Sequence, residues 1–66
     1  MNDELNMSVR KFLKQVGVTS QQAIEAALRD AGAGAQTGPH KARMVLTIKE
    51  LGLEHVVEGE IKGAAE

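Results

Sequence analysis

Residues 42–61 read ARMVLTIKELGLEHVVEGEI, and this stretch decides the fold. In its first half apolar residues alternate with others, and one side of a strand would carry Ala42, Met44, Leu46 and Ile48. The second half alternates again, and the matching side would carry Leu53, His55, Val57, Gly59 and Ile61. Alternation with a period of two is typical of a strand with one face buried. Between the two runs, residues 49–52 can form a tight turn with Gly52 at positive φ. We therefore predict an antiparallel β-hairpin over residues 42–61.

Charge gives an independent prediction of the register of this hairpin. When Ile48 lies opposite Leu53, the outer face carries two pairs of opposite charge, Arg43 with Glu58 and Lys41 with Glu60. Each such cross-strand pair stabilises a sheet by about 0.2–1 kcal/mol. A slip of one residue would turn the whole apolar set to the outer face. The apolar pattern and the charges therefore predict the same register.

The segment before the hairpin is predicted to form two helices. Residues 3–16 carry one helical face of apolar residues, made by Leu5, Val9, Phe12, Leu13 and Val16. Asn2 suits the N-cap of this helix, and Gly17 suits a left-handed C-terminal cap. The sequence Thr19-Ser20-Gln21-Gln22 reads as a capping box that starts a second helix over residues 20–31, which Gly32 ends.

Residues 32–40 contain three glycines and a proline and are predicted to form a flexible linker, and residues 62–66 a loose tail. A two-stranded ribbon alone is marginal in water, so its apolar face needs a cover. The expected fold is one small α+β domain over residues 1–66. It consists of a two-helix hairpin followed by an antiparallel β-hairpin packed on it, in the order α-α-β-β.

The small size of the chain favours a partner. A chain of 66 residues buries only about 60% of its unfolded surface, and domains of this size commonly need a staple. The absence of cysteine excludes a disulfide, and no Cys/His cluster predicts a structural zinc site. The remaining staple is a protein partner, most simply a second copy of the chain. The sequence thus leaves a homo-oligomer and a different protein partner as equally open expectations.

Several classes of function are not expected. No run of residues predicts a membrane span or a secretory signal, and with no cysteine the expected location is the cytoplasm. His40 and His55 are isolated and do not make a metal site. We also expect no cofactor and no catalytic residue, because no nucleophile or acid–base pair lies in a predicted cleft. The chain is expected not to be an enzyme.

Two surfaces remain as candidate interaction sites. The first is the basic face of the helix, which we define as Met7, Arg10, Lys11 and Lys14. These residues project opposite the apolar stripe, where they could bind phosphate or an acidic partner, although solvated charges are common at such positions. The second is the free edge of the hairpin, which could accept another strand, from a peptide or a second copy.

The expected function is a non-enzymatic protein-interaction module that self-associates through the hairpin edge or through apolar residues left uncovered. The alternative is a nucleic-acid-binding module that uses Arg10, Lys11 and Lys14. A net charge of −1 argues against this alternative, because domains that bind nucleic acid usually have a basic excess.

Two parts of the chain carry a resemblance, residues 6–14 and 16–21 before the linker, and residues 46–54 and 58–61 in the hairpin. In these stretches the chain resembles a family of very short bacterial proteins of unknown function. The resemblance implies a stand-alone protein. It does not imply a ligand, an activity or a site residue.

Overall fold

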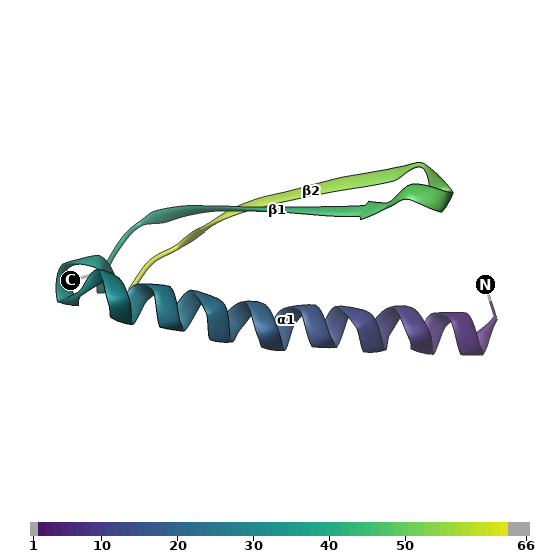
Figure 1. Ribbon diagram of the computed structural model, residues 1–66, viewed down its shortest axis with the longest axis horizontal. Coiled ribbons are helices and arrows are strands. Elements are labelled where there is room, and N and C mark those ends of the chain that lie inside the picture. The colour runs from purple at the N-terminus through teal and green to yellow at the C-terminus, as the bar shows by residue number, and fades with distance from the viewer. Residues whose placement is uncertain (1, 64–66) are drawn as a thin grey trace. The chain divides into compact units, whose positions relative to one another are not determined.

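The computed structural model describes residues 2–63, without the side chains of residues 35 and 36. The elements follow in the order α1 (Asp3–Ala31), the short 3₁₀ helix η1 (Ala33–Gln36), β1 (His40–Ile48), the 3₁₀ turn η2 (Lys49–Leu51) and β2 (Leu53–Ile61) (Figure 1). The chain divides into two units, Met1–Ala33 and Gly34–Glu66.

The first unit is a single helix, so the prediction of a two-helix hairpin was wrong. α1 runs without a break for 29 residues, from Asp3 to Ala31 (Figure 1). The predicted start at residue 3 and end at residue 31 are confirmed, but the predicted break at residues 17–19 is absent. The observed order of elements is therefore α-β-β instead of α-α-β-β.

The break was predicted from two residues that the helix accommodates. The Thr19 hydroxyl donates to the carbonyl of Gln15 at 3.0 Å, so it bonds back into the preceding turn instead of capping a new helix. A left-handed cap would require a positive φ at Gly17, and Gly17 does not have one. Both residues are compatible with a helix interior at a small cost in propensity.

The two ends of α1 are capped as the sequence predicts. The side chain of Asn2 accepts a hydrogen bond from the Leu5 backbone N–H at 2.7 Å. Asp3 and Glu4 lie in the first turn, where the helix dipole favours negative charge. At the other end Gly32 has φ +97°, and its N–H donates to the carbonyl of Arg29.

The hairpin and its register are confirmed. β1 and β2 pair antiparallel, with Ile48 opposite Leu53 at the turn and His40 opposite Ile61 at the other end. The two predicted charge pairs, Arg43 with Glu58 and Lys41 with Glu60, are directly opposite each other. β1 begins at His40, two residues before the predicted start of the hairpin.

Glycines close both ends of the ribbon. Gly52 follows η2 in the left-handed region, with φ +62°, and its N–H donates to the carbonyl of Lys49. At the open end the N–H of Gly63 donates to the carbonyl of Thr37 at 2.8 Å. Gly38 has φ +68°, and a Cβ on it would lie 2.6 Å from the Ile61 carbonyl oxygen. Residues 64–66 of the predicted tail lie outside the described residues.

No described residue is buried. The unbroken helix joins the two predicted apolar faces into one stripe along its length. At about 100° per residue, the apolar residues within 5–16 and those within 23–31 fall on the same side of the helix. Phe12 in this stripe is 50% exposed, and Val57 in β2 is 54% exposed. The described part of the chain therefore has apolar faces but no core.

Candidate functional site

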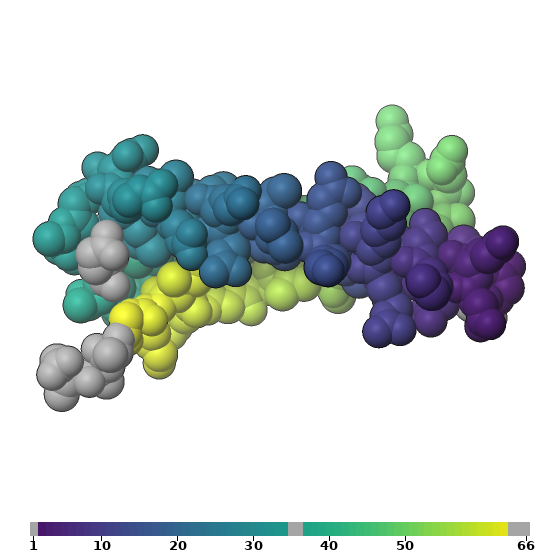
Figure 2. Space-filling model, turned by 90° about the horizontal axis from the view of Figure 1, so that it is seen from below, coloured from purple at the N-terminus to yellow at the C-terminus, as the bar shows by residue number. Residues whose placement is uncertain are grey.

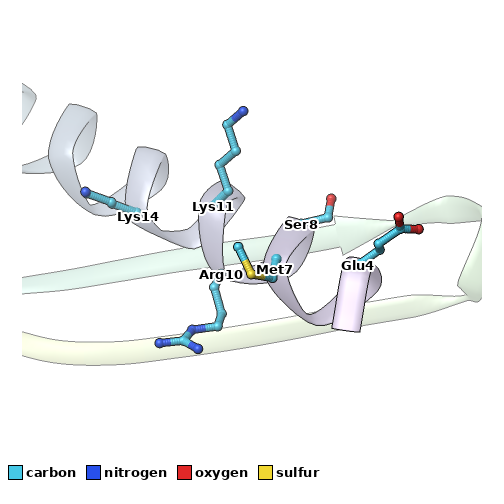
Figure 3. A pocket seen from close by; sticks show the side chains of 6 residues that line it. All are labelled: Glu4, Met7, Ser8, Arg10, Lys11 and Lys14. Atoms are coloured by element: carbon cyan, nitrogen blue, oxygen red, sulfur yellow. The ribbon is translucent and has the colours of Figure 1, made fainter. Parts of the chain in front are cut away.

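The basic face lies on one side of α1, as predicted. Its four residues line a single hollow together with Glu4 and Ser8 (Figure 3). The helical spacing explains why, since residues three or four positions apart are neighbours on a helix surface. The same spacing could have found Glu4 and Ser8 in the sequence, because they lie one turn before Met7 and Lys11.

The cations of the basic face do not converge on a point. Figure 3 shows the Lys11 and Arg10 side chains pointing away from each other, with Met7 between them. The hollow measures about 820 Å³, but among the described residues only those of α1 line it. A ligand pocket usually encloses most of its ligand, and one side of a helix cannot do this. The geometry therefore offers an open charged surface, and its role as an interaction site stays a prediction.

The continuous helix extends this surface into the region of the predicted break. A second hollow is lined by Lys11 and Lys14 together with Gln15, Val18 and Thr19. Figure 2 shows α1, from purple to teal, as one continuous row of residues. Val18 was predicted to lie between two helices and is instead a 49% exposed residue of α1, next to the basic face.

The edges of the hairpin form the second candidate site. The sheet has two strands, so each strand has one side without a neighbouring strand in the described part of the chain. The strands are nine residues long, and neither contains a proline that would block further pairing. Each edge is therefore a template onto which another strand can add.

The outer face of the hairpin carries opposite charges on its two strands. β1 contributes Lys41 and Arg43, and β2 contributes three carboxylates, those of Glu54, Glu58 and Glu60. Arg43 Nε lies 3.6 Å from Glu58 Oε2, and both side chains remain exposed. A shallow hollow over these strands is lined by Lys41, Ala42, Arg43, Glu58, Gly59 and Glu60. The two edges thus differ in charge, which bears on what each can bind.

Other kinds of site find no support within residues 2–63. No group of three or more His, Cys, Asp or Glu side chains there could hold a metal ion. His55 lies opposite Leu46 on the apolar face of the hairpin and is exposed. None of the helices in this part of the chain is both long and apolar enough to cross a membrane.

Comparisons with known proteins agree with the resemblance noted above. No curated protein and no solved structure matches the chain. The sequence model of one family, described as a family of unknown function, matches residues 1–64. This match covers both α1 and the hairpin, and the family's description names no activity or ligand. The chain belongs to this family of unknown function, DUF6494.

Proposed function

We propose that the chain is a non-enzymatic protein-interaction module that associates with a second copy of itself in the cytoplasm and needs no cofactor or metal. The observation that carries this proposal is the absence of any buried residue among those described, although 42% of the chain is hydrophobic. Contiguous exposed apolar surface usually marks a site of protein interaction.

Neither unit can bury its apolar residues alone. A single helix such as α1 has no second element to cover its stripe, and an isolated two-stranded ribbon is marginal in water. Large apolar side chains of α1, such as those of Leu5 and Leu13, are about half exposed, at 55% and 49%. No disulfide can stabilise the described chain, and association with a second copy would remove part of this apolar surface from water.

Sedimentation equilibrium between about 1 and 100 µM tests self-association, because mass action over that range reports micromolar affinities. We expect a mass of at least twice the 7.0 kDa of one chain at the upper end. The melting temperature, followed by circular dichroism, should rise with protein concentration because the partner binds only the folded state. A mass of 7.0 kDa throughout, with a melting temperature independent of concentration, would refute the proposal.

One observation favours the alternative of nucleic-acid binding. Arg10, Lys11 and Lys14 lie on the same side of α1 and make no ion pair with the described residues. Phosphates could neutralise these charges, and such binding should weaken steeply as the salt concentration rises. Glu4 in the same hollow and the net charge of −1 oppose it.

A fluorescence-anisotropy titration with mixed-sequence DNA and RNA at low salt separates the two functions. The matched variant is Arg10→Gln/Lys11→Gln/Lys14→Gln, which removes the charges and keeps good helix formers. Salt-sensitive binding that this variant loses would support the alternative. The absence of binding at low salt would exclude it and leave self-association as the proposed function.

A further inference from the structure

The charges on the hairpin select one of its two edges for self-association. Closed dimers are symmetric, so the same strand of each copy must meet at the two-fold axis. The hairpin therefore has two ways to close a dimer, through β1 against β1 or through β2 against β2. The confirmed register shows which side chains would face each other in either case.

Pairing through β2 opposes carboxylates. An antiparallel pairing of all nine residues of β2 with a second β2 centres on Val57. Because residues equally far from the centre then meet, Glu54 of one copy lies opposite Glu60 of the other, and this contact occurs twice. Like charges directly opposite each other destabilise a sheet. The acidic strand thus protects its own edge, as charged edge strands commonly do.

Pairing through β1 opposes no like charges. The full nine-residue register of β1 centres on Met44. It places Lys41 opposite Thr47 and Arg43 opposite Val45 on the outer face. On the other face Met44 meets Met44 of the second copy, and Ala42 meets Leu46. The apolar faces of the two hairpins then lie on the same side of one four-stranded sheet.

We infer that two copies of the chain pair antiparallel through β1, in the register centred on Met44, to form a sheet of order β2-β1-β1-β2. This inference rests on the proposed self-association and names the surface that carries it. It leaves the acidic β2 strands at the outer edges, where their carboxylates oppose the addition of further strands.

Single cysteines test the pairing, because the described chain contains no cysteine of its own. Met44→Cys and Val57→Cys are a matched pair, since these residues face each other within one hairpin and are both partly exposed. In the inferred dimer, the Cβ atoms of the two residues 44 lie about 4.5–5.5 Å apart. The two residues 57 are separated by three strand spacings, about 14 Å.

The mass of each variant in solution is first measured by sedimentation equilibrium under reducing conditions. The variant is then treated with dibromobimane, which bridges only neighbouring thiols. We expect both variants to associate like the parent chain, and the cross-linked dimer of Met44→Cys to exceed that of Val57→Cys several-fold. A third sample mixes the two variants and detects head-to-tail pairing of β1 with β2 by a cross-link between them.

The outcomes separate the inference from the function on which it rests. Cross-linking at residue 57, a dominant mixed cross-link, or dimers that cross-link at neither position would each overturn pairing through β1 while self-association stands. A mass of one chain for the parent at every concentration would overturn both.

Discussion

The helix and the hairpin of this chain differ in how far apart in the sequence their backbone hydrogen bonds reach. In α1 each backbone hydrogen bond joins residues four positions apart, so a single residue affects only its own turn. In the hairpin the ladder joins residues as far apart as His40 and Ile61, and its two ends depend on Gly38 and Gly52. A glycine is therefore dispensable inside α1 but required at the ends of the ribbon. Replacing glycine by alanine should therefore stabilise α1 but destabilise the hairpin.

The largest effect is expected at the open end of the hairpin. Gly38→Ala should destabilise the hairpin by about 2 kcal/mol, because the residue would be strained at positive φ and its Cβ would lie 2.6 Å from the Ile61 carbonyl oxygen. NMR at a fixed protein concentration measures this as weaker cross-strand NOEs between Met44 and Val57.

Gly34→Ala is the matched control, because Gly34 has ordinary φ and nothing lies within 4 Å of a Cβ placed there. Its cross-strand NOEs should equal those of the parent chain. An equal loss in both variants would show that the conformation of Gly38 does not hold the hairpin together.

Gly17→Ala should have a smaller effect with the opposite sign. Because Gly17 lies inside α1 with open space around it, alanine should stabilise the helix by about 0.5–1 kcal/mol.

Gly52→Ala should destabilise the hairpin by a similar amount, since Gly52 is left-handed with φ +62°. Thermal unfolding by circular dichroism measures both. Destabilisation by Gly17→Ala would mean that residue 17 needs a backbone conformation that alanine does not readily adopt.

A third comparison concerns two residues that the sequence presents as helix caps. Asn2→Ala should cost about 1 kcal/mol, because it removes the hydrogen bond from the Leu5 N–H. Thr19→Ala should instead stabilise α1 by about 0.5 kcal/mol, because alanine has the higher propensity in a helix interior. Circular dichroism at 222 nm through thermal unfolding distinguishes the two signs. A loss of stability in Thr19→Ala as large as that in Asn2→Ala would mean that Thr19 acts as a cap.

The hairpin could be predicted residue by residue because two independent signals restrict it. The apolar alternation sets the faces, and the opposed charges at Arg43 and Glu58 set the register. The helix ends were equally predictable from Asn2 and Gly32. The middle of α1 was not, because a glycine followed by a Thr-containing capping box fits both a break and a helix interior at similar local cost.

The sequence predicted the candidate site correctly only for residues within the part of the helix that was itself predicted correctly. Met7 and the three cations lie on one side of α1 because they fall within the part that was placed correctly. Val18 was missed as a neighbour of this surface because it fell in the predicted break. The direction of each cation is a matter of side-chain rotamers, which the spacing of residues along a helix does not determine.

The smallest effect is expected where the sequence signal was most useful. The Arg43–Glu58 pair helped to identify the register, yet its N···O distance is 3.6 Å and its side chains are 61% and 71% exposed. Exposed ion pairs contribute little, so a double-mutant cycle of Arg43→Gln and Glu58→Gln should give a coupling of no more than about 0.5 kcal/mol. A coupling above about 1 kcal/mol, measured by thermal unfolding, would mean that association shields the pair from water. Because opposed charges exclude wrong registers even when they add little stability, the pair can specify the hairpin without holding it together.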